Sequence, residues 1–172
     1  MHGVTLGSAA ATCVPGRRSQ DGAMNQPLPA DPAPASFRLD PRLAGDGPAL
    51  GDLPLCHVRL VDDARFFWIV LVPRRPALVE LIDLPAPERG VLMEEIATAS
   101  TALKAVSGCT KLNVAALGNM VPQLHVHIIG RVAGDAAWPG PVFGVGVRDP
   151  LGPALAARAE LLRAALGLIA PV

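Results

Sequence analysis

The most informative stretch of the chain covers residues 121–129 and reads Val-Pro-Gln-Leu-His-Val-His-Ile-Ile. Polar and apolar residues alternate along it, which is the pattern of a β-strand with one face in an apolar core. We therefore predict a strand over residues 123–131, with Gln123, His125 and His127 on one face. The opposite face would carry three apolar residues, Leu124, Val126 and Ile128.

Two histidines on one strand face have three interpretations. They can be surface residues without a chemical role, or they can form half of a zinc site that takes further ligands from His57, a cysteine or a carboxylate. The third interpretation is nucleophilic catalysis at phosphorus. Imidazole has an ordinary pKa of about 6.5, so much of it is neutral and nucleophilic near neutral pH. We favour the third interpretation.

Three further strands are expected upstream. Residues 57–61 alternate, and residues 66–72 are rich in aromatic and β-branched side chains before Pro73. The turn-like residues 62–65 between them predict an antiparallel hairpin. Residues 111–114 predict another strand.

One long helix is expected over residues 86–106. Its apolar residues recur at spacings of four and three, which is the helical period, and Gly108 follows as a stop signal. The residues of this stripe are Leu92, Ile96, Ala99, Leu103 and Val106. A short helix over residues 77–84 and a C-terminal helix over residues 155–166 are also expected, with a long loop at 133–150 before the latter.

The order strand, strand, helix, strand, strand groups the helices instead of alternating them with strands. This order predicts an α+β domain with an antiparallel sheet covered by helices on one side. Residues 1–35, rich in Pro, Gly and Ala, predict a disordered extension, which leaves residues 36–172 as the domain. Within it we expect residues 36–55 to be irregular and regular structure to begin at Cys56.

The composition narrows the possible partners and the compartment. The 172 residues carry 15 basic and 15 acidic side chains, so no net charge favours nucleic acid or an anionic membrane as partner. The apolar run at residues 66–73 is too short to span a bilayer, and the N-terminus lacks the order of an export signal. We therefore expect a cytoplasmic protein. Its three cysteines, Cys13, Cys56 and Cys109, predict free thiols, the last two as small buried residues.

The run from Gln123 to Ile129 resembles the signature of the histidine triad (HIT) family, His-φ-His-φ-His-φ-φ, where φ is apolar. The lead-in at residues 118–121, Gly-Asn-Met-Val, resembles the family's Gly-Gln-x-Val run. Residues 68–75, WIVLVPRR, resemble its strand that ends in Pro-Lys/Arg. The likeness extends from about residue 56 to residue 138.

The resemblance implies an enzyme that is a metal-independent nucleotide phosphohydrolase or nucleotidyltransferase, without a cofactor. His125 would attack the α-phosphorus of a nucleotide derivative and form a covalent nucleotidyl-histidine, while His127 would orient or protonate the phosphoryl oxygens. The implied substrates are dinucleoside polyphosphates or nucleoside phosphoramidates. The implied fold is a five-stranded antiparallel sheet with two main helices, paired with a second copy as a homodimer.

The resemblance also implies a set of substrate-binding residues. Asn119, at the family's Gln position, would donate a hydrogen bond to phosphate, with Gly118 and Val121 of the lead-in beside it. Asn113 is a candidate for a nearby polar contact, or a residue of a turn or core edge. Trp138 resembles a Trp-Pro element that borders the active site in some members, although it can equally pack a loop.

Two departures from the family pattern affect the expected chemistry. Gln123 replaces the first histidine, and an amide forms hydrogen bonds but does not titrate. The family's ribose-contacting Asp is replaced by a short turn, in which Asp62 and Asp63 are better explained as turn residues. The alternatives are therefore a nucleotide-binding module without turnover and a zinc-binding protein that uses His125 and His127. A scaffold role through the Pro-rich tail is also open.

Overall fold

A five-stranded antiparallel sheet, in the order β1-β2-β3-β5-β4, forms the centre of the computed structural model, which describes residues 36–169. Its strands are β1 (Ala49–Asp52), β2 (Cys56–Leu60), β3 (Phe67–Pro73), β4 (Lys111–Ala115) and β5 (Val126–Arg131). The predicted extension at residues 1–35 and Cys13 lie outside the described residues. The expected hairpin is formed by β2 and β3, with His57 paired to Val72.

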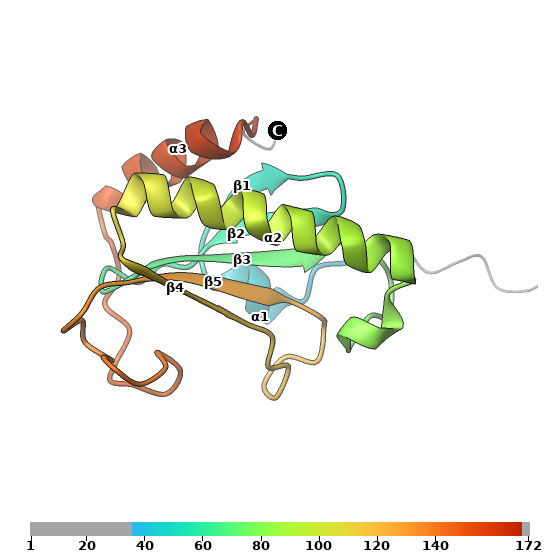
Figure 1. Cartoon of the computed structure of the whole chain (residues 1–172), viewed down its shortest axis with the longest axis horizontal. Helices are drawn as coiled ribbons and strands as arrows, with labels where there is room; N and C mark the ends of the chain where they lie inside the picture. The colour runs from blue at the N-terminus through green and yellow to red at the C-terminus, as the bar shows by residue number, and fades with distance from the viewer. Residues whose placement is uncertain (1–35, 170–172) are drawn as a thin grey trace, which may run out of the picture. The chain divides into compact units, whose positions relative to one another are not determined.

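Two helices, α2 (Ala86–Ser107) and α3 (Ala154–Leu166), cover one face of the sheet (Figure 1). The apolar stripe of α2 faces the sheet, with Leu92, Ala99 and Leu103 buried. The helix ends at Gly108, whose φ of 65° is the left-handed conformation expected of a C-terminal glycine. Antiparallel strands and segregated helices confirm the predicted α+β fold. Pairing of two chains stays a prediction.

The expected irregularity of residues 36–55 is wrong. This segment forms α1 (Pro41–Gly45) and the edge strand β1, which pairs with β2 through an irregular register between Ala49 and Gly51. Gly51 has φ 140°, and a Cβ there would lie 2.9 Å from the Ile169 carbonyl oxygen. A strand of four residues that needs glycine where it approaches Ile169 carries no alternating pattern, which is why sequence reasoning missed it.

The expected helix at residues 77–84 is also wrong in extent. Only one 3₁₀ turn forms, η1 (Leu81–Asp83). Ala77 has a φ of 56°, outside the helical region, and the Asp83 carboxylate accepts hydrogen bonds from the main-chain N–H groups of Val79 and Glu80. These local bonds replace the helical ones that a longer helix would need.

The strand expected from residue 123 begins only at Val126. Before it, the Leu124 N–H donates to the Leu78 carbonyl, outside the sheet ladder. The alternation still holds, because Leu124, Val126 and Ile128 enter the helix-covered core as predicted. On the opposite face, α1 places Leu43 against Val70 and other apolar residues, and much of that face remains available for a site.

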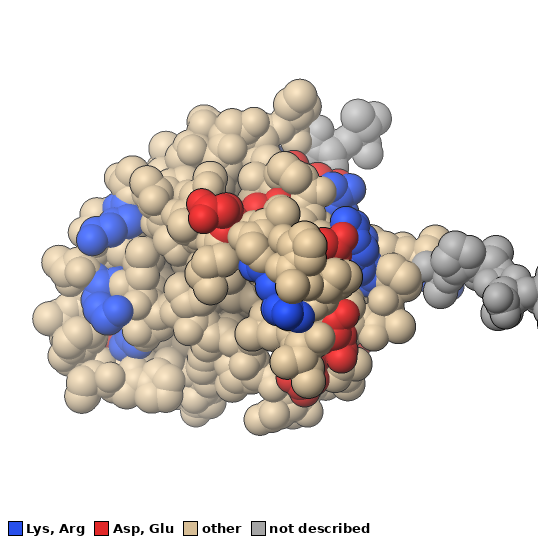
Figure 2. Space-filling view, turned by 45° about the vertical axis from the view of Figure 1, so that its right-hand side comes forward, with Lys and Arg blue, Asp and Glu red and all other residues tan. Residues whose placement is uncertain are grey.

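The surface carries no broad area of one charge sign in the view of Figure 2, where basic and acidic side chains are interleaved. This agrees with the balanced composition of the sequence. Over residues 36–169, none of the helices combines the length and apolar character needed to cross a membrane.

A buried glutamate links α2 to the start of β2. The Glu95 carboxylate accepts hydrogen bonds from the main-chain N–H groups of Leu55 and Cys56, at 2.6 and 2.9 Å. Burial, together with a hydrogen bond to Glu95, raises the pKa of the Cys56 thiol far above its usual range. Cys56 therefore remains a protonated, free thiol, and Cys109 is likewise buried and free, as predicted.

We predict that Glu95→Ala lowers the free energy of unfolding by about 3 kcal/mol, because two buried N–H groups lose their acceptor. Glu94→Ala, on the exposed side of the same helix, should change it by less than about 0.5 kcal/mol. Urea unfolding followed by circular dichroism measures both. A loss below about 1 kcal/mol for Glu95→Ala would show that these hydrogen bonds are dispensable.

Candidate functional site

The candidate site is a hollow of about 490 Å³ on the sheet face opposite α2 and α3. Four parts of the chain form most of its wall: the α1 segment, Leu117 with the lead-in at residues 118–121, strands β3 and β5, and the loop at residues 143–148. His125 and His127 both line it, with Gly118, Asn119 and Val121 of the lead-in. The structure thus brings together five of the eight residues that the sequence nominated.

His125 lies directly before β5 and is buried, with 6% of its surface exposed. Its Nδ1 lies 2.6 Å from the main-chain oxygen of Gln123. A carbonyl oxygen only accepts hydrogen bonds, so Nδ1 must carry the proton in the neutral ring. Nε2 is then left with a free lone pair, which is the state that a nucleophile requires.

His127, on β5, is held in the opposite tautomer. The indole N–H of Trp68 on β3 donates to its Nδ1 at 3.1 Å. Because an indole only donates, the proton of neutral His127 lies on Nε2. Burial and the nearby His125 lower the pKa of His127 to about 4, so the ring is neutral at neutral pH. The two histidine rings are 4.7 Å apart between centroids.

Gln123 lies beside the hollow and not in its lining. Its side-chain N–H donates to the Arg38 carbonyl at 2.9 Å, and its side-chain oxygen accepts from the Asp40 N–H at 2.8 Å. Two residues after Asp40, in α1, the Arg42 guanidinium donates to the Met120 carbonyl at 2.6 Å. These bonds fasten the α1 segment, which carries Leu43 and Asp46 in the hollow wall, to the lead-in.

Asn113 and Trp138 lie outside the hollow. The Asn113 side-chain oxygen accepts from Arg131 at 2.6 Å, and Asn113 lines a neighbouring groove on the β4 side. Trp138 is 44% exposed, and the Arg131 guanidinium lies 5.7 Å from its ring centroid. Both residues therefore contact Arg131 and not the histidines.

Arg131 anchors the loop that follows β5. It is fully buried and forms a two-pronged ion pair with Asp135, at 2.7 and 2.8 Å. The hydrogen bond from Arg131 holds the pKa of Asp135 at about 2. The same guanidinium donates to the Gly140 carbonyl at 3.0 Å, so it fixes the loop on the way to Phe143.

Sequence reasoning missed several residues of the hollow. Phe143 packs edge-on against His127 and Trp68, with ring centroids 5.1 and 5.6 Å away. On another wall, Asp46 and Arg148 form an ion pair of 2.8 Å between segments about a hundred residues apart. Trp68 had a signal, because the strand alternation puts it on the face of His127. The others lie in irregular segments without a pattern.

Neither turn aspartate lies in the hollow. The Asp62 carboxylate accepts from the Leu151 N–H at 2.7 Å, and the Asp63 carboxylate pairs with Arg65 at 2.7 Å. Asp62 therefore holds the loop after β2 against the segment before α3, and Asp63 stabilises that loop from within. Asp46 is the acidic side chain that the structure places in the hollow wall.

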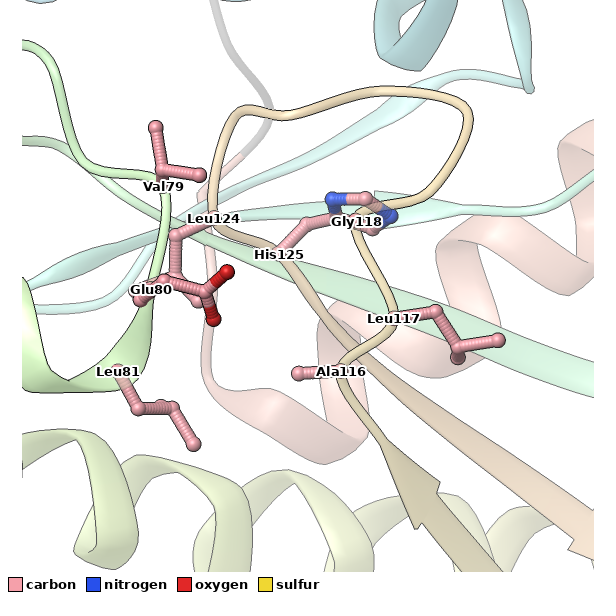
Figure 3. A pocket seen from close by; sticks show the side chains of 8 residues that line it. All are labelled: Val79, Glu80, Leu81, Ala116, Leu117, Gly118, Leu124 and His125. Carbon is pink, nitrogen blue, oxygen red and sulfur yellow. The ribbon is translucent and has the colours of Figure 1, made fainter.

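A second, much smaller hollow of about 70 Å³ also includes His125 in its lining (Figure 3). It is formed by Val79 and Glu80 before η1, by Leu81 at the start of η1, by residues 116–118, and by Leu124 beside His125. No group of three or more His, Cys, Asp and Glu side chains within residues 36–169 is arranged to hold a metal ion.

The comparisons with known proteins agree with this geometry. A family model described as HIT domain matches residues 46–134. A histidine triad protein from Bradyrhizobium japonicum is 48% identical, with a TM-score of 0.72, over 77% of this chain and 97% of that one. A histidine triad protein from Marinobacter aquaeolei is 41% identical, with a TM-score of 0.74, over 77% and 98%.

A third solved structure, a histidine triad protein from Sinorhizobium meliloti, is 41% identical, with a TM-score of 0.71, over 77% of this chain and 97% of that one. None of the curated proteins matches the chain significantly. The family model and the solved structures are therefore the matches that relate this chain to known proteins.

We predict that buried His127 makes stability depend on pH. The unfolded chain binds a proton on this histidine below about pH 6.5, and the folded chain only below about pH 4. The contribution of His127 to the free energy of unfolding is therefore fully present above about pH 6.5 and is lost as the pH falls from there toward about 4. Between pH 7.5 and pH 5 the native protein should lose about 2 kcal/mol more than His127→Gln, which keeps an acceptor for Trp68.

Urea unfolding of the native protein and of His127→Gln at both pH values measures this difference, since the other titrating groups are common to both chains. Equal losses in the two proteins would mean that His127 accepts a proton as readily in the folded chain as in the unfolded one.

Proposed function

The chain belongs to the histidine triad (HIT) family, and from this premise we propose that it cleaves nucleotides at the α-phosphate through a covalent nucleotidyl-histidine on His125. The family includes nucleotide hydrolases as well as members without catalysis. The observation that carries a catalytic role is the hydrogen bond from Nδ1 of His125 to the Gln123 carbonyl, which leaves Nε2 unprotonated.

Two steps follow from this tautomer. In the first, Nε2 of His125 forms a bond to the α-phosphorus, while the bond to the leaving group breaks and its electron pair goes to the leaving atom. In the second, a water oxygen attacks the phosphorus and the P–N bond breaks, returning its electron pair to Nε2. The water gives up a proton to solvent, and a nucleoside monophosphate is released.

His127 supports these steps as a neutral donor. Its proton lies on Nε2 because Trp68 donates to Nδ1, so the ring offers an N–H to a phosphoryl oxygen. Because its pKa is lowered to about 4, the ring does not take up a second proton at neutral pH. A preorganised donor at an oxygen on which charge develops is worth about 2.7–4 kcal/mol in catalysis.

The large hollow suits a nucleoside monophosphate. Its volume of about 490 Å³ lies within the range of about 300–1,000 Å³ that is usual for small-molecule sites. Trp68, Phe143, Leu43 and Val61 give it apolar and aromatic walls for a base, and Asn119 supplies an amide in the lead-in. Dinucleoside polyphosphates and nucleoside phosphoramidates are the two substrate classes that we propose for the site.

Gln123 acts in this proposal as a positioning residue. Its main-chain oxygen sets the tautomer of His125, and its side chain fastens Arg38 and Asp40. Neither task needs a titrating group, so glutamine in place of the family's first histidine is compatible with turnover.

The first test is intact-mass analysis in EDTA after brief mixing with diadenosine tetraphosphate or with an adenosine phosphoramidate, at mildly acidic and neutral pH. We expect an adenylyl adduct or released AMP, and its loss in His125→Ala. His57→Ala, which removes a histidine from β2 outside both hollows, should retain it. Bound nucleotide without adduct or AMP would favour a binding module, and an adduct that persists in His125→Ala would displace His125 as nucleophile.

The second test separates positioning from chemistry. Gln123→Met keeps the length of the side chain but loses both hydrogen bonds, which loosens the wall that carries Leu43 and Asp46. Two lost hydrogen bonds predict an increase in KM of about tenfold, with kcat changed much less. Steady-state kinetics measure the split, and the melting temperature of the variant controls for unfolding. A fall in kcat at constant KM would assign Gln123 to the chemical step.

A further inference from the structure

The group that leaves the phosphorus in the proposed reaction can require a proton. When the bond to this group breaks, the electron pair stays on the leaving atom. An amine nitrogen that departs with this pair is a very strong base and needs a proton in the same step. The bridging oxygen of a phosphoric anhydride departs as a stable anion and needs none. The presence or absence of an acid in the site therefore decides which leaving groups it can expel.

His127 is the histidine beside the nucleophile that could act as such an acid. Trp68 donates to its Nδ1 at 3.1 Å, so the single proton of the neutral ring lies on Nε2. A second proton would have to enter at Nδ1, where it would meet the indole N–H and not an acceptor. Burial and the nearby His125 also lower the pKa of His127 to about 4. At neutral pH the ring is therefore a hydrogen-bond donor and not an acid.

His125 and Gln123 supply no proton either. Nε2 of His125 is the proposed nucleophile, and its Nδ1–H is directed at the Gln123 carbonyl, 2.6 Å away. After the attack the ring is positively charged, and this N–H remains bonded to the same oxygen. The Gln123 side chain is an amide, which donates hydrogen bonds but does not titrate. The run from Gln123 to His127 thus offers a nucleophile and one neutral donor.

The carboxylates of the two hollows are poorly placed to act as acids. In the large hollow, Asp46 accepts a hydrogen bond from Arg148 at 2.8 Å, and a guanidinium does not release its proton. In the small hollow, Figure 3 shows both ring nitrogens of His125 pointing away from Glu80. In-line attack by Nε2 expels the leaving group on the side of phosphorus opposite His125. Glu80 therefore does not meet the departing atom.

The other residue types that act as general acids are lysine, tyrosine and cysteine. The chain contains no tyrosine, and neither lining includes a lysine or a cysteine among the described residues. Cys56 and Cys109 lie in the helix-covered core, and Lys111 lines the separate groove beside β4. Within residues 36–169, the walls around His125 therefore hold no side chain that is placed to protonate a leaving atom at neutral pH.

We infer that the site expels its leaving group without protonating it, and that it therefore selects nucleotide anhydrides over nucleoside phosphoramidates. The inference rests on the proposed function and decides between its two substrate classes. It assigns His127 to orienting the phosphoryl oxygens, on which charge develops with any leaving group. A general acid contributes about 10²–10⁴-fold where a site provides one, and an amine leaving group would lack this factor.

The step balances without a further reactant. The bond from Nε2 of His125 to the α-phosphorus forms while the P–O bond to the bridging oxygen of the anhydride breaks. The electron pair of the broken bond stays on that oxygen, which becomes a terminal oxygen of the departing phosphate anion. No proton moves in this step. The positive charge that develops on the imidazole ring is stabilised by the Gln123 carbonyl, which accepts from Nδ1–H.

The test varies the basicity of the leaving group while its shape stays similar. Adenosine 5′-phosphate esters of 4-nitrophenol, 4-chlorophenol and phenol release aryl oxides of increasing basicity. Diadenosine tetraphosphate and the adenosine phosphoramidate of 2-aminoethanol represent the two substrate classes. The rate for each compound is measured at pH 7 in quenched single turnovers, as the sum of adenylyl adduct on His125 and released AMP.

We expect the phenyl ester to react at least about a hundredfold more slowly than the 4-nitrophenyl ester, because an acid that reduces this difference is missing. Diadenosine tetraphosphate should react faster than the phosphoramidate by a similar factor. Imidazolium buffer, raised at constant pH and ionic strength, should accelerate the phosphoramidate and leave the tetraphosphate unchanged, because a small acid from solution can replace the missing one.

Three variants identify an acid if the site has one. His127→Gln should slow the 4-nitrophenyl and phenyl esters by the same factor, because a donor to the phosphoryl oxygens serves both reactions. Glu80→Gln and Asp46→Asn should also leave the ratio of the two rates unchanged. Removal of a true acid would slow the phenyl ester much more than the 4-nitrophenyl ester, and such a result in any of the three variants would overturn the inference.

Two further results would contradict it: a difference between the phenyl and 4-nitrophenyl esters below about a hundredfold, or a phosphoramidate that reacts as fast as the tetraphosphate. In each of these cases the adduct on His125 still forms, so the proposed function stands. Absence of adduct and of AMP with all five compounds would instead refute the proposed function, and the inference with it.

Discussion

The register of β3 against β5 is the constraint on which both the core and the site depend. It pairs Val70 with His127 and Ile69 with Ile128, so one face of β5 meets the helices and the other meets Trp68. A slip by one residue would exchange these faces, bringing His127 into the apolar core and Ile128 to the hollow. Such a slip would expose the apolar side chains along the whole of β5, and the free energy that this costs keeps His127 on the side of the hollow.

Within this register, the tautomer of each histidine is set by a neighbouring group that can act only as an acceptor or only as a donor. The Gln123 carbonyl can only accept, and the Trp68 indole can only donate. As a result, the two rings, with centroids 4.7 Å apart, offer different atoms in their neutral forms: a lone pair from His125 and an N–H from His127. In the proposed reaction, His125 would supply the lone pair of the nucleophile and His127 the N–H of a donor, and glutamine at position 123 leaves both tautomers as they are.

The sequence predicted the parts of the fold that repeat with a period. The strand at residues 57–61 and the long helix follow from alternation and from helical spacing, because burial on one face imposes them, and the strand at 66–72 follows from its run of aromatic and β-branched residues. The short strand β1 escaped because Gly51 and an irregular register leave no period to detect. The start of β5 was placed too early because the Leu124 N–H donates to the Leu78 carbonyl and not to a neighbouring strand, a contact between distant segments that no local pattern encodes. The walls of the hollow could not be predicted either, since Asp46, Phe143 and Arg148 come together only in the folded chain. For the same lack of long-range information, Asn113 and Trp138 were grouped with the histidines, although both contact Arg131.

The loop after β5 is fastened at two points of different character. Near its start, the Arg131–Asp135 pair is dry, with both side chains almost wholly buried, whereas near its end the Arg148–Asp46 pair is in contact with water. Mobile ions screen the second pair and barely reach the first. Higher ionic strength therefore affects one side of the hollow only. It weakens the Arg148–Asp46 pair beside α1, while the buried Arg131 continues to hold the loop that leads to Phe143. A solvent of high ionic strength would therefore weaken the ion pair at the rim without loosening the aromatic side chains beside the histidines.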